Sequence, residues 1–310
     1  MGAGINGGVW PTMVTPYTSD NRIDYAGLEK LIEWYIARGV HGLFAVCQSS
    51  EMFYLSLEER VSLASFVKRT AAGRVPVIAS GHISEAFEDQ VEELNRIAQT
   101  GIDALVLITN RLASQEESDE VWIERMERLL QQLPEELTLG LYECPYPYKR
   151  LLSPKVIEWC ADSGRFRFLK DTSCDIEDIR LKLEAAGGSG LQIFNANAAT
   201  LLESLKLGVA GFSGVMANFH PELYVWLVEN WKDRPEEAAR LADLLSVCSL
   251  IERQLYPANA KYHLLLEGIL TDVSCRNLNG QTLSATNRLE VEQLRRVFGE
   301  YSNRISTINL

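Results

Sequence analysis

Short apolar runs alternate along the chain with longer segments whose apolar residues recur at helical spacing. The runs are rich in Val, Ile and Leu, which is typical of strands buried on both faces of a parallel sheet. They predict eight strands, at residues 9–15, 42–46, 75–80, 104–109, 137–143, 167–171, 192–195 and 211–215. The segments between them predict seven amphipathic helices, at residues 25–38, 57–72, 85–100, 118–133, 154–162, 176–186 and 198–207.

A local pattern recurs where a helical segment gives way to a strand. It reads ARGVHGLFAV, QTGIDALVLI and KLGVAGFSGV in three places. The first glycine of each, Gly39, Gly101 or Gly208, fits the left-handed residue that ends a helix. Ser153 followed by Pro154 predicts a cap and a first helical turn in the same way.

Strand and helix alternate strictly, which predicts a parallel sheet with helices on its faces. Eight repeats predict an α/β fold of the (β/α)8 TIM-barrel class, and an open doubly wound sheet is the structural alternative. We place the barrel at residues 1–218. Residues 219–310 are predicted to form a C-terminal helical region packed on the barrel.

The overall charge limits the kinds of binding partner that can be expected. The chain has 310 residues and a net charge of −12, without a cluster of Lys and Arg. Nucleic acids and anionic membrane surfaces are bound through basic patches, so neither is expected as a partner. No apolar run reaches the roughly 18 residues of a membrane span, and the N-terminus lacks the basic start and apolar core of a secretory signal.

The cysteines and histidines indicate neither disulfides nor a metal. The six cysteines include no pair with CxxC spacing, as expected of reduced thiols in a cytoplasmic protein. The four histidines lie far apart in the sequence, so a histidine-built metal site is not expected.

The clearest chemical signal is a lysine at the end of a predicted strand. The stretch FRFLKDTSCDI places Lys170 directly after an apolar run, although an unpaired buried cation costs several kcal/mol. In a barrel this strand end opens into the active site, beside Tyr142 at the end of the preceding strand. A desolvated lysine can attack a ketone and form a Schiff base while a tyrosine shuttles protons. Alternatively, Lys170 pairs with an acid such as Asp171 and only ends the strand.

Several stretches resemble one family of enzymes. These are CQSSEMFYLSLEER after the second strand, YECP after the fifth, KDTS after the sixth and GVAGFSGVMANFHPEL around the eighth. In content and spacing they are similar to the dihydrodipicolinate synthase/N-acetylneuraminate lyase family of class I Schiff-base aldolases. The resemblance covers the chain from Gly8 to about Phe298.

The resemblance implies a role for five residues. Lys170 would form the Schiff base and Tyr142 would donate and accept protons. Ser49 and the backbone N–H groups near Ser49 and Ser50 would hold the substrate carboxylate, and Ser213 falls where the family contacts the keto acid through a backbone carbonyl. The keto acid is usually pyruvate, its aldehyde partner is not indicated, and no metal or other cofactor is needed because the iminium withdraws electrons. The family also implies a homotetramer or homodimer.

Two departures from the family pattern affect the proton relay. Gln48 stands where the family has a hydroxyl residue that passes protons to the tyrosine. Asn110 falls near the place of the relay tyrosine at the end of the fourth strand. Both are retained as candidate substrate-binding residues, because an amide can form hydrogen bonds although it relays protons poorly.

Further departures concern the loop after Tyr142. The synthase carries an arginine five positions after its tyrosine, where this chain has Pro147. Lys149 or Arg150 would have to replace it. Glu143, in place of the common Asn, is expected either to act as a second acid/base or to form a salt bridge with Arg150 or Lys149.

We therefore predict a Schiff-base lyase or aldolase that forms or cleaves a carbon–carbon bond with pyruvate or a related 2-keto acid. A keto-deoxy sugar acid dehydratase or hydratase would use the same Lys170 and Tyr142. The departures argue against 4-hydroxy-tetrahydrodipicolinate synthase and against a sialic acid lyase. With Gln48 and Asn110 in the relay positions, a non-catalytic keto-acid-binding relative is the remaining alternative.

Overall fold

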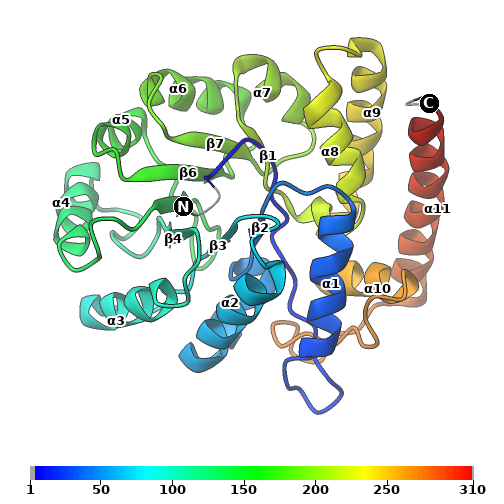
Figure 1. Cartoon of the computed structure of the whole chain (residues 1–310), viewed down its shortest axis with the longest axis horizontal. Coiled ribbons are helices and arrows are strands. Elements are labelled where there is room, and N and C mark those ends of the chain that lie inside the picture. The colour runs from blue at the N-terminus through cyan, green and yellow to red at the C-terminus, as the bar shows by residue number, and fades with distance from the viewer. Residues whose placement is uncertain (1–3, 309–310) are drawn as a thin grey trace.

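Eight parallel strands surround the centre of the computed structural model, which describes residues 4–308 and the side chains of residues 4–302 (Figure 1). From β2 to β8 each strand pairs with the next, and β8 pairs with β1. The strands are β1 (Gly8–Val9), β2 (Leu43–Phe44), β3 (Val77–Ala79), β4 (Ala104–Ile108), β5 (Leu139–Tyr142), β6 (Phe166–Asp171), β7 (Gln192–Asn195) and β8 (Gly211–Phe212).

The sheet closes where the chain leaves β1. Thr12 forms a parallel bridge with Phe44 of β2, and the Met13 N–H donates to the Phe44 carbonyl at 3.0 Å. On the other side, β1 and β8 approach so closely that a Cβ on Gly211 would lie 1.9 Å from the Gly8 carbonyl oxygen. The predicted (β/α)8 barrel is therefore confirmed, and the open doubly wound sheet is excluded.

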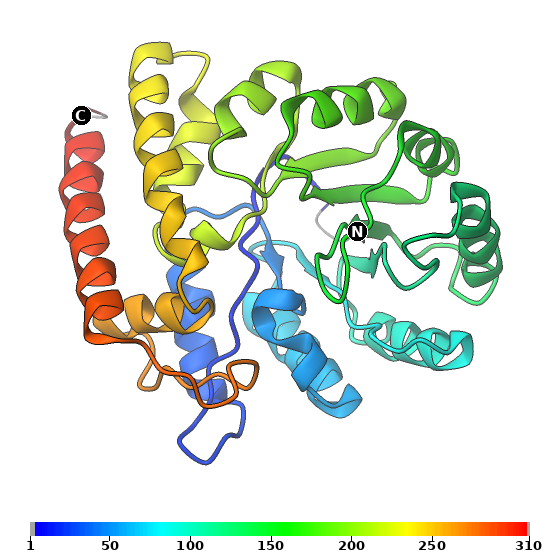
Figure 2. The same cartoon turned by 180° about the vertical axis from the view of Figure 1, so that it is seen from behind.

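Helices cover the outside of the strands (Figures 1 and 2). Those between the strands are α1 (Tyr25–Ala37), α2 (Leu57–Ala71), α3 (Phe87–Ala98), α4 (Asp119–Leu130), α5 (Pro154–Asp162), α6 (Ile176–Ala186) and α7 (Leu201–Leu207). The predicted helices agree with these bounds to within three residues at each end. Within the described part of the chain, no helix is long and apolar enough to cross a membrane.

The predicted helix ends have the expected backbone geometry. Gly39, Gly101 and Gly208 have φ angles of 76°, 77° and 115°, which side chains with a Cβ rarely adopt. The Ser153 hydroxyl accepts a hydrogen bond from the Val156 N–H at 3.3 Å and caps α5. These local predictions from glycine, serine and proline are confirmed.

The C-terminal part begins with a helix that belongs to the barrel's outer layer. Helix α8 (Pro221–Asn230) packs on β1 and β8, beyond the predicted boundary at residue 218. The remaining elements are α9 (Pro235–Cys248), the 3₁₀ turn η4 (Ser249–Arg253), α10 (Ala258–Leu266) and α11 (Ala285–Ile308). Helix α11, red in Figure 1, runs along the outer edge of the molecule and contacts α10.

Four aromatic side chains fill the interior of the barrel beneath the strand ends. The Phe168 ring stacks on Phe194 with 4.5 Å between centroids, and it contacts Trp10 at 5.6 Å and Phe44 at 6.0 Å. All four are fully buried. They form an apolar floor, so a polar group placed just above them is removed from water on that side.

Candidate active site

Lys170 and Tyr142 lie side by side at the carboxyl ends of neighbouring strands. They are register partners in the β5–β6 pair, so both side chains point to the same side of the sheet. The Lys170 Nζ lies 4.9 Å from the centre of the Tyr142 ring, and the ring packs edge-on against Phe44 of the apolar floor. Their exposed fractions are 3% and 4%, so both polar groups are held in a dry environment.

This environment changes the acid–base properties of both residues. Burial lowers the pKa of Lys170 from 10.5 to about 8, against an opposing effect of Cys47, Cys144 and Glu252. About one-tenth of the amine is then unprotonated at pH 7, which makes it available as a nucleophile. Burial also raises the pKa of Tyr142 well above 10, so its phenol holds a proton that it can donate.

Gln48 faces Tyr142 across the barrel mouth. It begins the 3₁₀ turn η1 (Gln48–Ser50), which is separated from the end of β2 by three residues. The Tyr142 hydroxyl donates to the Gln48 Oε1 at 3.5 Å, and the Cys144 thiol donates to the same oxygen at 3.6 Å. An amide oxygen accepts a hydrogen bond from the phenol but has no proton of its own to pass on. Gln48 can therefore orient Tyr142 without relaying protons.

Ser49 belongs to a group of hydroxyls beside the lysine. Its hydroxyl donates to the Thr12 Oγ1 at 3.2 Å, and hydrogen bonds from Ser49 and Thr12 act on the hydroxyl of Tyr256. The Tyr256 hydroxyl also accepts a hydrogen bond from the Asn218 Nδ2 at 3.1 Å. Several O–H donors thus converge on one side of the pocket, a suitable arrangement for a carboxylate.

Three predicted site residues lie next to the pocket without lining it. The Ser50 hydroxyl bonds the backbone of Cys47, and the Ser213 hydroxyl donates to the Trp10 carbonyl at 2.9 Å. Asn110 donates from its Nδ2 to carbonyls of the loop after β5, at residues 144, 146 and 148. The structure therefore places the Asn110 amide as a support for that loop.

The expected salt bridge of Glu143 with Arg150 or Lys149 is wrong. The Glu143 carboxylate points away from the pocket and binds Lys182 of α6 at 2.6 Å. Lys182 also binds Asp171 at 2.5 Å, and all three side chains are fully buried. Burial raises the pKa of Glu143 to about 7, although Lys182 opposes the shift. Since side chains alternate along a strand, the residues that follow Tyr142 and Lys170 face the helices and not the barrel interior.

The two cations considered as replacements for the synthase arginine differ in position. Lys149 lines the pocket and donates from its Nζ to the Thr172 carbonyl at 2.7 Å. Arg150 is turned away from the pocket, where it binds backbone carbonyls before α4 and the Asp119 carboxylate at 3.2 Å. Only Lys149 can therefore reach a substrate.

The pocket itself has a volume of about 350 Å³ and combines strand ends with the C-terminal segment. Its lining residues are Gln48, Ser49, Tyr142, Pro145, Lys149, Lys170, Thr172, Cys174, Ala196, Asn197, Val215, Glu252, Arg253, Tyr256, Pro257 and Asn277. The residues from 252 onward do not follow any strand, so a search of the strand ends misses them. Tyr256 lies in the stretch YPANAKYHLLLEGI, just before α10, and no strand pattern points to it.

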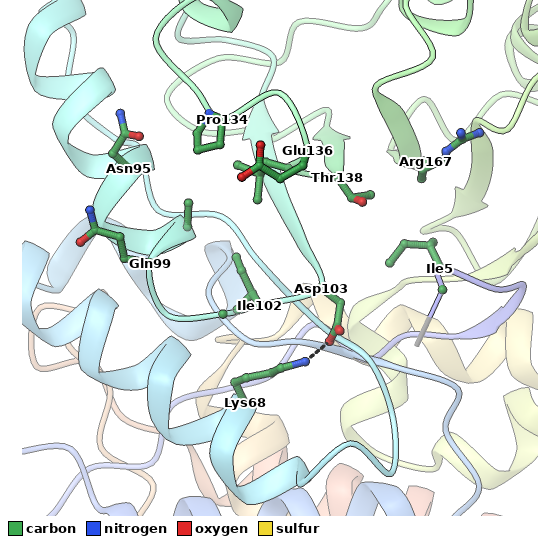
Figure 3. Close-up of a pocket in the computed structure, with 14 residues that line it drawn as sticks. Ile5, Lys68, Asn95, Gln99, Ile102, Asp103, Pro134, Glu136, Thr138 and Arg167 are labelled. Carbon is green, nitrogen blue, oxygen red and sulfur yellow. Dashed lines mark hydrogen bonds and ion pairs between the residues drawn. The ribbon is translucent and has the colours of Figure 1, made fainter. Parts of the chain in front are cut away.

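A second hollow, of about 760 Å³, lies at the amino ends of the strands (Figure 3). Lys68 and Asp103 form an ion pair there at 2.6 Å, and Asp103 also accepts from the Val77 N–H. This end of a barrel serves stability rather than catalysis. Within residues 4–308, no group of three His, Cys, Asp or Glu side chains could hold a metal ion.

Comparisons with known proteins match the chain to one family and one fold. A sequence model of the "Dihydrodipicolinate synthetase family" matches residues 6–294. A 4-hydroxy-tetrahydrodipicolinate synthase of Bacillus velezensis is 25% identical over 292 residues, covering 93% of this chain and 98% of the relative. The same-named enzyme of Acidithiobacillus ferrooxidans is 27% identical over 211 residues, covering 68% and 70%. The crystal structure of YagE, a prophage protein of the same family from Escherichia coli K12 in complex with pyruvate, has a TM-score of 0.83 at 24% identity and covers 95% of this chain and 98% of that one.

Proposed function

Because the chain belongs to the dihydrodipicolinate synthetase family, we propose that it is a lysine Schiff-base lyase acting on pyruvate or a related 2-keto acid. The observation that carries the proposal is the buried Lys170 amine, with its pKa lowered to about 8, next to the Tyr142 phenol. The reaction forms or cleaves a carbon–carbon bond to an aldehyde. The pyruvate complex of YagE supports the choice of keto acid.

The proposed reaction begins with attack of the neutral Lys170 amine on the keto carbon. Loss of water leaves an iminium, whose positive charge makes the adjacent carbon acidic. Removal of a proton from that carbon gives an enamine, which attacks the aldehyde carbon to form the new bond. The aldehyde oxygen takes up a proton, and water then hydrolyses the iminium and frees Lys170. Cleavage is the same sequence in reverse.

Tyr142 is the proposed carrier of these protons. Among the described residues that line the pocket, Tyr142 is the only tyrosine on a strand that pairs with the strand of Lys170. Gln48 holds the phenol in place. Ser49, Thr12 and Tyr256 are proposed to hold the carboxylate of the keto acid through their hydroxyls, since Ser49 and Tyr256 line the pocket and Thr12 is bonded to Ser49.

The site does not favour 4-hydroxy-tetrahydrodipicolinate synthase chemistry. That enzyme, in the family to which the chain belongs, needs a hydroxyl relay to the tyrosine and an arginine for the aldehyde's carboxylate. Here Gln48 contacts the tyrosine and Asn110 supports a loop. Arg150 is bound to backbone carbonyls outside the pocket.

Intact mass after treatment with pyruvate and borohydride tests the proposal. We expect a reduced pyruvate adduct on the native protein and none on Lys170→Ala. Lys149→Ala is the matched control, since Lys149 lines the same pocket, and it should still be trapped. Absence of an adduct on native protein at saturating pyruvate, or an adduct that persists in Lys170→Ala, would contradict the proposal.

We also propose that the chain forms a homo-oligomer. Three of the exposed apolar side chains lie on outer helices: Leu181 of α6 is exposed by 37%, Leu207 of α7 by 42% and Val247 of α9 by 68%. Helix α7 contacts both α6 and α9. We propose that these exposed apolar side chains are covered by a second subunit. Light scattering should give a mass above 34.8 kDa for the native protein and a lower mass for Val247→Glu.

A further inference from the structure

The wall of the pocket opposite the strand ends carries polar groups that no part of the protein uses. Glu252 and Arg253 enter the pocket from η4, and Asn277 enters from the loop before α11. Within the described residues, the Glu252 carboxylate and the Arg253 guanidinium have no hydrogen-bond or ion-pair partner, and the buried Asn277 Oδ1 has none either. The Asn277 Oδ1 is buried, the Glu252 side chain is half-buried and Arg253 is exposed, so the wall offers unused hydrogen-bonding groups to a ligand in the pocket.

Several other polar groups of the pocket are already engaged within the protein. Lys149 donates to the Thr172 carbonyl, and the Thr172 hydroxyl donates to the Glu143 carbonyl at 2.7 Å. Asn197 accepts the Thr200 N–H on its Oδ1. Among the described residues that line the pocket, the strongest acceptor without a partner is the Glu252 carboxylate on the C-terminal wall.

We propose that Glu252 recognises the second substrate, and that this substrate is an aldehyde with hydroxyl groups next to its carbonyl, as in a sugar-derived aldehyde. The inference rests on the proposed function, because the aldehyde meets the enamine formed on Lys170. The Glu252 carboxylate accepts hydrogen bonds from substrate hydroxyls. Asn277 accepts another through its Oδ1, and Arg253 donates to a hydroxyl oxygen.

The chemistry of a carboxylate favours this class of aldehyde over two others. An apolar aldehyde would leave the half-buried Glu252 carboxylate and the Asn277 Oδ1 desolvated without partners. An aldehyde with its own carboxylate would bring a second negative charge against Glu252. Burial raises the pKa of Glu252, while Lys170 and Arg253 lower it, so the cations of the site help to keep it ionised.

Condensation with two aldehydes of the same chain length tests the proposal. Native protein and Glu252→Gln are each given pyruvate with D-glyceraldehyde or with propanal, and kcat/KM is measured for both. Native protein should prefer D-glyceraldehyde. Glu252→Gln should lose about ten- to a hundredfold in kcat/KM for D-glyceraldehyde and change less than about threefold for propanal, because only the hydroxylated aldehyde bonds the carboxylate. Glu236→Gln, an exposed position of α9, is the control and should match native protein.

Borohydride trapping separates this inference from the proposed function. Glu252→Gln should still form the pyruvate adduct, because Lys170 is intact. If no adduct forms on native protein, the proposed function fails and the inference fails with it. If the adduct forms but native protein condenses neither aldehyde, prefers propanal, or loses both aldehydes equally in Glu252→Gln, only the assignment of Glu252 is overturned. A preference for succinic semialdehyde that disappears in Arg253→Gln would overturn it in favour of an anionic aldehyde.

Discussion

At the level of single residues, the amine of Lys170 is controlled by what surrounds it. It stands above the aromatic floor, beside the Tyr142 ring, and is 3% exposed. Burial in these surroundings lowers its pKa to about 8. The shift from 10.5 corresponds to about 3 kcal/mol of lost stability, which the rest of the fold has to offset. The same desolvation makes the amine nucleophilic.

The first prediction concerns the pH dependence of Schiff-base formation. Only the neutral amine attacks the keto carbon, so the initial rate of adduct formation with pyruvate should rise about tenfold per pH unit below pH 8 and level off above it. Single-turnover trapping between pH 6 and 10 measures the profile. Lys149→Ala should keep the same inflection. A native profile that still rises beyond pH 10 would show that Lys170 has the pKa of an ordinary, exposed lysine and would contradict the prediction.

The second prediction concerns stability at the same residue. Between pH 8 and 10.5 the unfolded chain binds the lysine proton and the folded chain does not, so stability rises with pH in that window. Below pH 8 the full free-energy cost of burying the charged Lys170 amine is present. Lys170→Met should therefore raise the free energy of unfolding by about 2–4 kcal/mol at pH 7 and by much less above pH 10.5. Urea denaturation at both pH values measures it, and a destabilised variant at pH 7 would refute the argument.

At the level of elements, a buried ion cluster fastens α6 to the two strands that carry Tyr142 and Lys170. Lys182 of α6 binds Glu143, which follows Tyr142 on β5, and Asp171, which follows Lys170 on β6. Burial alone would lower the pKa of Lys182, but the surrounding carboxylates raise it overall. Glu143 also accepts N–H groups of residues 152 and 172, so one side chain joins two loops of the site.

Removal of the cation from this cluster gives the third prediction. Lys182→Met leaves two fully buried carboxylates without a counter-charge and should lower the free energy of unfolding by about 3–5 kcal/mol. The loss should be larger at pH 8 than at pH 5.5, because unpaired buried carboxylates must be protonated and this costs more as pH rises. Lys206→Met removes an exposed pair with Glu203 and should cost less than about 1 kcal/mol. Equal losses in the two variants would refute the role of the cluster.

At the scale of the whole molecule, the C-terminal segment completes a site that the barrel begins. It is tied to the loop after β2 by a fully buried ion pair, with Lys261 Nζ and Glu51 Oε1 at 2.7 Å. The second oxygen of Glu51 accepts the N–H groups of Arg276 and Asn277. One carboxylate therefore positions both the turn beside Ser49 and the loop that brings Asn277 into the pocket.

The fourth prediction tests this connection. Glu51→Gln keeps the shape of the side chain but leaves Lys261 without its counter-charge, so the free energy of unfolding should fall by about 3–5 kcal/mol. Because the pocket wall shifts with the loop, kcat/KM for condensation should fall as well. Glu58→Gln, which affects only an exposed pair with Arg96, is the matched control and should change neither quantity measurably. Urea denaturation and the condensation assay report the two effects.

The sequence by itself determined the barrel and the position of the two residues proposed to be catalytic. Buried strands and amphipathic helices have different apolar periods, so their alternation is readable without coordinates. Glycine at the helix ends and Ser153 before α5 act through local geometry, and their roles followed from residue type alone. Lys170 and Tyr142 could be identified because strand ends converge in a barrel and because their surroundings resemble a family.

Only the tertiary structure decided which other groups reach the site. Side chains alternate along a strand, so Glu143 turned out to face α6 although its neighbour Tyr142 faces the barrel interior. The roles of Asn110 and Arg150 depended on the path of one loop, which no periodic pattern encodes. Glu252, Tyr256 and Asn277 come close to Lys170 only because the C-terminal segment folds back over the barrel mouth. Contacts between segments so distant in sequence are set by packing, whereas the elements that make them are set by local pattern.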